Sequence, residues 1–188
     1  MIFPVAFMAL TLIGSGLSRR ELFLTRGDMR ARGRILLPFL PRVSWVWLAL
    51  LVSIVFLGPT LAQLISLIRP DVSLAQRVLV ALPLILAVGL IRSFQEDFRF
   101  RLVLLARLAP VLGARQALLM SSFLFGLVYW MSSSPPNGLA GTLISGIAGW
   151  ILGASILETR GFAWTWIIHA LAETLAVTIL VMTTIHSH

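Results

Sequence analysis

The sequence contains neither cysteine nor lysine among its 188 residues, and it is poor in charge of either sign. The lack of cysteine excludes disulfide bonds and thiolate chemistry. Charged residues make up 12% of the chain, whereas an ordinary soluble domain carries about 25%. Hydrophobic residues make up 59%. This composition excludes an ordinary soluble domain and is typical of an integral membrane protein, which we expect in a bacterial inner (plasma) membrane.

Long apolar runs predict the membrane spans. They cover residues 2–17, 43–68, 77–91, 116–131, 139–157 and 162–185. A charged segment at residues 92–101 is expected to open a further helix, which continues to about residue 108 and is broken by Pro110 and Gly113. The predicted fold is therefore all-α, a single polytopic transmembrane helical bundle of six to seven spans over residues 1–188.

The basic residues gather in the connectors between the apolar runs. The connector at residues 18–42 carries seven arginines against Glu21 and Asp28. By the positive-inside rule this connector is predicted to be cytoplasmic. Because the excess positive charge flanks apolar spans, it does not indicate a nucleic-acid partner. The expected partners are membrane lipid and a peptide or membrane protein, as substrate or as binding partner.

The charged segment at residues 92–101 is the most informative feature of the chain. It holds Arg92, Glu96, Asp97, Arg99 and Arg101 between two apolar stretches. Each charge near the bilayer centre costs roughly 2.5–3.5 kcal/mol on insertion scales, so five together imply mutual pairing or a water-filled cavity. The segment predicts a functional site, with a short interfacial loop between two spans as the alternative.

Helical spacing within this segment predicts which side chains face each other. Asp97 and Arg101 are four residues apart, as are Arg92 and Glu96, so each pair lies on one helix face. An Asp97–Arg101 pair would be structural. Glu96 is then the carboxylate best placed to face a cavity.

Two later stretches carry further candidate residues. Residues 125–129, ending in Tyr129, lie late in the apolar run at residues 116–131. His169 and Glu173 are one helical turn apart in the last run, so both side chains point the same way. An intramembrane histidine is often only an interhelical hydrogen-bond partner, but an acidic neighbour on the same face favours a functional site.

Three glycines predict close helix packing in the apolar run at residues 139–157. Gly146, Gly149 and Gly153 lie along one side of the expected helix. Small residues at this spacing allow another helix backbone to approach closely. We interpret this stripe as a packing device and not as a site.

Taken in order, the three polar patterns resemble a known family. They read Glu96-Asp97-x-x-x-Arg101, Phe125-x-x-x-Tyr129 and His169-x-x-x-Glu173. They are similar to the motifs Glu-Glu-x-x-x-Arg, Phe-x-x-x-His and His-x-x-x-Asn or Asp of the CPBP family. This is the CAAX-prenyl-endopeptidase and bacteriocin-processing (Abi) group of intramembrane proteases. The resemblance covers residues 90–176, the motif-bearing core.

The resemblance implies roles for the matching residues. Glu96 would be the general base that activates a water, and His169 an oxyanion donor. Arg101 would be the structural partner within the first motif, where Asp97 replaces the second glutamate and keeps its charge. Phe125 matches the aromatic residue of the second motif.

Two positions depart from the family pattern. Tyr129 stands where the family has a histidine, and a tyrosine, with a reference pKa of about 10, donates a hydrogen bond at neutral pH but is not a base. Glu173 stands where the family has asparagine, and a carboxyl group donates only when it is protonated.

Three alternatives follow from these departures. The first is an altered protease without a cofactor, in which Glu96 is the base and Tyr129, His169 and a neutral Glu173 are donors. The second is a catalytically inactive family member that acts as a membrane scaffold or partner subunit. The third is a zinc site with Glu96, His169 and Glu173 as ligands, although hydrolase zinc sites more often use two or three histidines.

Overall fold

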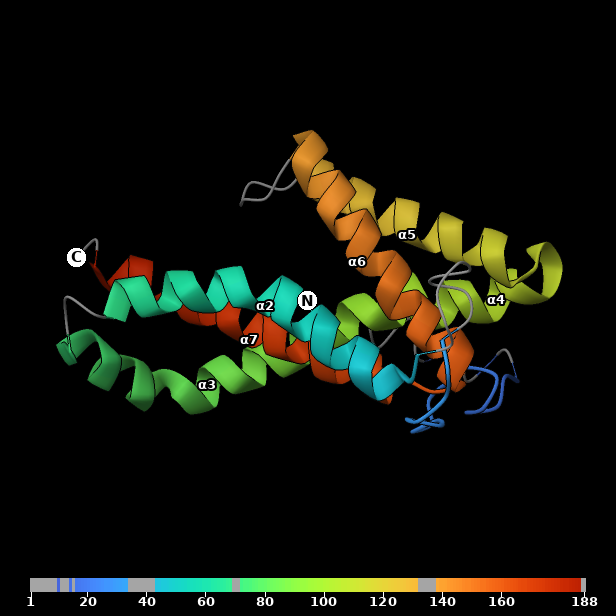
Figure 1. Cartoon of the computed structure of the whole chain (residues 1–188), viewed down its shortest axis with the longest axis horizontal. Helices are drawn as coiled ribbons and strands as arrows, with labels where there is room; N and C mark the ends of the chain where they lie inside the picture. The colour runs from blue at the N-terminus through green and yellow to red at the C-terminus, as the bar shows by residue number, and fades with distance from the viewer. Residues whose placement is uncertain are drawn as a thin grey trace. The chain divides into compact units, whose positions relative to one another are not determined.

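The computed structural model describes residues 10, 14, 16–33, 43–68, 72–131 and 138–186, with the side chains of 68, 72–75 and 185–186 left out. These residues form helices and no strand, apart from one isolated bridge between Arg32 and Ser44. The predicted all-α class is thus confirmed. Most of the expected first span at residues 2–17 lies outside the described residues. The elements in order are α2 (Trp45–Ile68), α3 (Val72–Asp97), the π-helix η1 (Phe98–Val103), α4 (Leu104–Leu112), α5 (Ala114–Trp130), α6 (Gly138–Thr159) and α7 (Ala163–His186) (Figure 1).

Four described helical stretches are long and apolar enough to cross a membrane. They are Trp45–Leu67, Gln76–Leu112, Gly138–Thr159 and Ala163–Thr184. Helix α5, with 17 residues, is not among them. The expected count of six to seven spans is therefore not confirmed within the described part of the chain.

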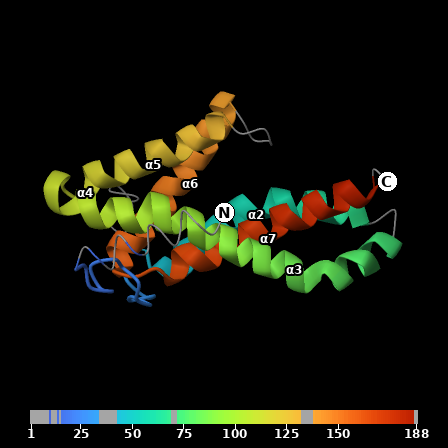
Figure 2. The same cartoon turned by 180° about the vertical axis from the view of Figure 1, so that it is seen from behind.

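The predicted break between a third and a fourth span is wrong. One helical stretch runs from Gln76 to Leu112, straight through the charged segment (Figure 2). Pro110 lies inside α4, and the stretch ends only at Gly113, whose φ of 86° is a conformation that glycine adopts freely. Pro110 has no N–H to donate to the Ala106 carbonyl four residues earlier, but the loss of this one hydrogen bond does not end the stretch.

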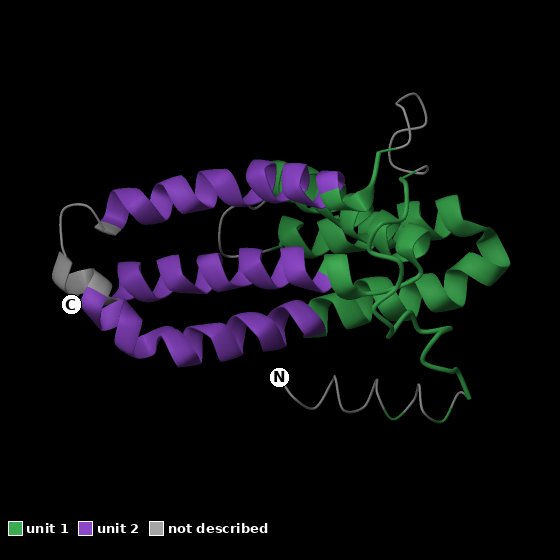
Figure 3. Ribbon diagram, turned by 60° about the horizontal axis from the view of Figure 1, so that its bottom comes forward, with its two compact units in different colours: residues 1–46, 95–165 green, residues 47–94, 166–188 purple. Residues whose placement is uncertain are grey.

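The chain separates into two compact units (Figure 3). Unit 1 comprises Met1–Val46 and Gln95–Thr165, and unit 2 comprises Trp47–Phe94 and Trp166–His188. The prediction of a single domain stays a prediction.

In unit 1, α5 and α6 lie side by side with their backbones in close approach (Figures 1 and 2). A Cβ atom on Gly126 would lie 2.6 Å from the Thr142 carbonyl oxygen. From the other side, Gly149 makes room for the Phe125 ring, which a Cβ atom would meet at 3.1 Å. The glycine stripe of α6 is therefore a packing device, as the sequence predicts, and it fixes the position of Phe125.

The N-terminal connector is anchored to the turn between α6 and α7, also within unit 1. The Asp28 N–H donates to the Thr159 carbonyl and the Phe162 N–H donates to the Thr25 carbonyl, both at 2.8 Å. Two tryptophan side chains reinforce this anchor. The Trp45 indole N–H donates to the Glu158 carboxylate at 2.7 Å, and that of Trp164 donates to the Met29 carbonyl at 2.9 Å.

Unit 2 has its own apolar core, formed by Val78, Ile85, Val177 and Met182 of α3 and α7. The two helices approach each other closely at Gly89. A Cβ atom there would lie 2.9 Å from the backbone of Thr174, so only glycine permits this spacing. The close approach brings the C-terminal half of α3 against the part of α7 that carries Glu173.

Candidate active site

Glu96 and Tyr129 lie together in unit 1. The Tyr129 hydroxyl donates to Oε2 of Glu96 at 3.5 Å, and both side chains are half-buried. O–H···O hydrogen bonds usually measure about 2.5–3.0 Å, so this contact is loose. Catalytic hydrogen bonds are often long without substrate and tighten when it binds. The structure thus joins the first and second motifs through the tyrosine that departs from the family pattern.

Phe125 organises the surroundings of Tyr129. Its ring meets the Tyr129 ring edge-on with centroids 5.4 Å apart, and the Phe100 ring edge-on at 5.6 Å. The guanidinium carbon of Arg101 lies 4.3 Å from the Phe125 ring centroid. Edge-on aromatic pairs and a cation over an aromatic face are both attractive. Phe125 therefore orients Tyr129 and helps to hold a buried charge.

Asp97 and Arg101 form the ion pair that their spacing predicts. Both residues are fully buried. Nε and Nη2 of Arg101 have no hydrogen-bond partner among the described residues, so Asp97 and the Phe125 ring carry the stabilisation of its charge. Their burial indicates a structural role in unit 1.

The π-helix η1 begins directly after Asp97, which the sequence reading missed. The wider turn breaks the regular hydrogen-bond ladder, and the Ser121 hydroxyl of α5 donates to the Phe100 carbonyl there. Single π-helical turns inside α-helices occur frequently at functional sites. The only feature of the sequence that marks this part of the chain as unusual is the density of charge in residues 92–101.

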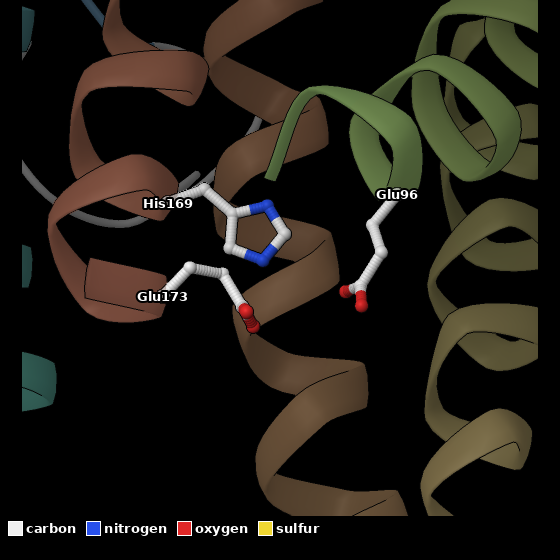
Figure 4. Close-up of side chains that lie close together, drawn as sticks. All are labelled: Glu96, His169 and Glu173. Atoms are coloured by element: carbon white, nitrogen blue, oxygen red, sulfur yellow. The ribbon is translucent and has the colours of Figure 1, made fainter. Parts of the chain in front are cut away.

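His169 and Glu173 project from the same side of α7 in unit 2 (Figure 4). Both are buried, with 7% and 8% of their surface exposed. This arrangement follows from their spacing of four residues on a helix. Glu96, drawn in the same figure, belongs to unit 1. The predicted zinc ligands thus come from both units, and zinc binding stays a prediction.

Arg92 pairs with Glu173, a partner that the sequence reading did not anticipate. Nε of Arg92 lies 3.0 Å from Oε2 of Glu173, within unit 2. The spacing of four residues on a helix instead predicts Glu96 as the partner of Arg92. The pair holds one oxygen of Glu173 against a cation, and the role of neutral donor considered from the sequence stays a prediction.

The sequence model of the family described as "Type II CAAX prenyl endopeptidase Rce1-like" matches residues 77–175, more than half of the chain. The chain belongs to this family. The match confirms the resemblance to CAAX proteases, and its range contains all the candidate residues named above. Family membership and the four apolar helical stretches together make this Rce1-like chain an integral membrane protein. No curated protein and no solved structure matches it.

Proposed function

We propose that this Rce1-like protein is an intramembrane endopeptidase in which Glu96 activates the attacking water. Tyr129 and His169 donate hydrogen bonds to the oxyanion. The observation that carries the proposal is the contact between Tyr129 and Glu96. This contact brings the hydroxyl group of the motif-two residue, a hydrogen-bond donor, to the carboxylate that we assign to water activation. The assignment of His169 rests on the order of the three family motifs.

The chemistry needs one proton shuttle and two donors. Glu96 takes a proton from water as the oxygen attacks the scissile carbonyl carbon. The negative charge that develops on the carbonyl oxygen accepts hydrogen bonds from Tyr129 and His169, which stabilises the tetrahedral species. Protonated Glu96 then returns its proton to the leaving amine as the C–N bond breaks. The products are a carboxylic acid, which ionises in water, and an amine, and Glu96 is regenerated.

Glu173 is assigned a supporting role in this scheme. Nε of Arg92 lies 3.0 Å from Oε2 of Glu173, so this carboxyl group is held by a cation of α3. It lies one helical turn from His169, and both side chains project from the same side of α7. We therefore propose that Glu173 positions His169 and supports its donation.

The family description indicates the substrate class to test, a peptide with a prenylated CAAX end. We propose the bacterial inner membrane as the location, with residues 18–42 in the cytoplasm and six to seven spans in total. The decisive assay uses purified protein in lipid vesicles with a fluorogenic prenylated peptide and its unprenylated counterpart.

Glu96→Gln should remove cleavage almost completely, because the amide cannot take the proton. Asp28→Asn is the matched control, since this exposed carboxylate lies in the connector and, among the described residues, accepts the Arg30 N–H. Cleavage that survives Glu96→Gln would refute the assignment of the base. A folded wild-type protein that cleaves neither peptide would instead support the inactive scaffold.

A further inference from the structure

Unit 1 contains a cavity of about 790 Å³ that the proposed protease chemistry does not use. One wall is apolar and comes from α4 and the end of α6, with Leu105, Ala106, Ala109, Pro110 and Leu157. The other wall comes from Leu17 and the N-terminal connector, with Arg20, Glu21, Phe23 and Thr25, and Arg160 completes it. This volume lies in the range of small-molecule sites, about 300–1,000 Å³.

The polar side of the cavity is basic. Arg20 and Arg160 are both exposed, and neither forms an ion pair within the described part of the chain. Thr25 ties the two walls together, because its hydroxyl donates to the Arg160 carbonyl at 2.9 Å. This hydrogen bond therefore also fixes the backbone of Arg160 beside the cavity. Arg20 lines the same cavity from the connector.

Glu21 is the one acidic residue of the lining, and its carboxylate is already engaged. Oε2 of Glu21 accepts the Ser18 backbone N–H at 2.7 Å, and the Ser18 hydroxyl accepts the Glu21 N–H. Hydrogen bonds from Ser18 lower the pKa of Glu21, so it is ionised at neutral pH. Two arginines against one carboxylate leave the cavity with a net positive charge.

Backbone strain is also concentrated here. Among the described residues, Phe23 and Arg160 are the non-glycine residues with positive φ, at 56° and 53°, and both line the cavity. Arg160 follows the last residue of α6, where a left-handed residue is usually glycine. Strained residues of this kind cluster at ligand sites, where the surrounding structure holds them in place.

We propose that this cavity binds an anionic phospholipid of the membrane, with its phosphate on Arg20 and Arg160 and an acyl chain along the α4 wall. Three observations favour this occupant over a free anion: the apolar wall, the open basic rim, and the place of both in an integral membrane protein. Anionic lipids of the cytoplasmic leaflet attract arginine clusters beside membrane helices. This lipid site is separate from the proposed protease chemistry, and its test does not depend on catalysis.

The test measures lipid retention by native mass spectrometry. Wild-type protein is released from nanodiscs that contain phosphatidylglycerol and phosphatidylcholine in equal amounts. We expect phosphatidylglycerol to be retained preferentially. In Arg20→Gln/Arg160→Gln, its affinity should fall about fivefold for each arginine, which corresponds to roughly 1 kcal/mol per basic residue at an anionic surface.

Arg107→Gln/Arg115→Gln is the matched control. It removes the same charge from exposed positions of α4 and α5 that do not line the cavity. It should retain phosphatidylglycerol like the wild type. Ala109→Phe is a second probe that keeps every charge but fills the apolar wall, and it should also release the lipid.

Three results would overturn the proposal. Equal retention of both lipids would remove the anionic preference. An equal loss of phosphatidylglycerol from Arg107→Gln/Arg115→Gln would mean that retention depends on the net charge of the protein and not on this cavity. Competition by inorganic phosphate as effective as that by phosphatidylglycerol would mark a simple anion site without an acyl-chain contact.

Discussion

At the scale of single residues, the most consequential position is Tyr129. A tyrosine at the motif-two position is a donor and not a base, and its hydroxyl faces Glu96. Sequence reasoning could reach this role because the motif spacing alone identifies the residue. It could not identify the partner of Arg92, since the ion pair with Glu173 depends on how α3 packs against α7.

Tyr129→Phe is expected to lower kcat by about 10²–10³-fold, the loss typical of a missing oxyanion donor. The phenyl ring keeps the edge-on contact with Phe125, so the fold should be unaffected. Steady-state cleavage of the prenylated peptide and a thermal melt check these two points. An unchanged kcat would exclude Tyr129 from the chemistry.

Tyr129→His restores the family residue and separates an altered protease from an inactive scaffold. A working enzyme should keep or increase its cleavage rate, because imidazole can donate a hydrogen bond and also take up a proton. A scaffold should gain no measurable cleavage of the same peptide. A gain of activity from a silent wild type would contradict both hypotheses as stated.

Asp97→Ala should destabilise unit 1 by about 3–5 kcal/mol, because it strands the buried Arg101 charge. Thermal unfolding in detergent measures the effect. Asp97→Ala/Arg101→Met is the informative comparison, since removing both charges should cost less than removing one. If the single variant melts like the wild type but cleaves nothing, Asp97 belongs to the catalytic group.

At the scale of helices, the apolar runs predicted the bounds of α2, α6 and α7 closely. The charged stretch at residues 92–101 instead led to the wrong prediction of a break between two spans. An apolar pattern that is interrupted by five charges in ten residues predicts the end of a membrane span. In the structure the helix continues, because Arg101 is neutralised by Asp97 within the stretch and Ser121 satisfies a carbonyl of the π-helix. The ion pair is local and follows from the spacing of the two residues, whereas the Ser121 hydrogen bond is a tertiary contact with α5, which no local pattern reveals.

Gly126→Ala should force α5 and α6 apart and lower the melting temperature, because its Cβ atom would lie 2.6 Å from a backbone oxygen. Gly58→Ala is the control. Gly58 lies inside α2 with no atom near its Cβ position, so alanine should be neutral or stabilise by about 0.5–1 kcal/mol. Thermal melts of both variants compare packing with helix propensity. Equal shifts would mean that the α5–α6 approach is not tight.

At the scale of the whole molecule, composition and motif order were sufficient for the membrane class and the family. The division into two units was not predictable, because it follows from which helices pack together and not from a linker in the sequence. Unit 1 joins the N-terminal connector to residues 95–165, so the connector is part of that unit and not a mere tether. Its location relative to the membrane therefore determines which leaflet supplies the proposed lipid.

The excess of arginine in residues 18–42 predicts that this connector is cytoplasmic. The absence of cysteine makes the test clean, since Arg30→Cys introduces the sole thiol of the chain at an exposed position. A membrane-impermeant maleimide should leave this thiol unlabelled in intact spheroplasts and label it in inverted vesicles. A permeant maleimide, the control, should label it in both. Labelling by the impermeant reagent in spheroplasts would place the connector outside. The basic rim of the cavity would then face the opposite leaflet, where the cytoplasmic surface potential that favours an anionic lipid does not act.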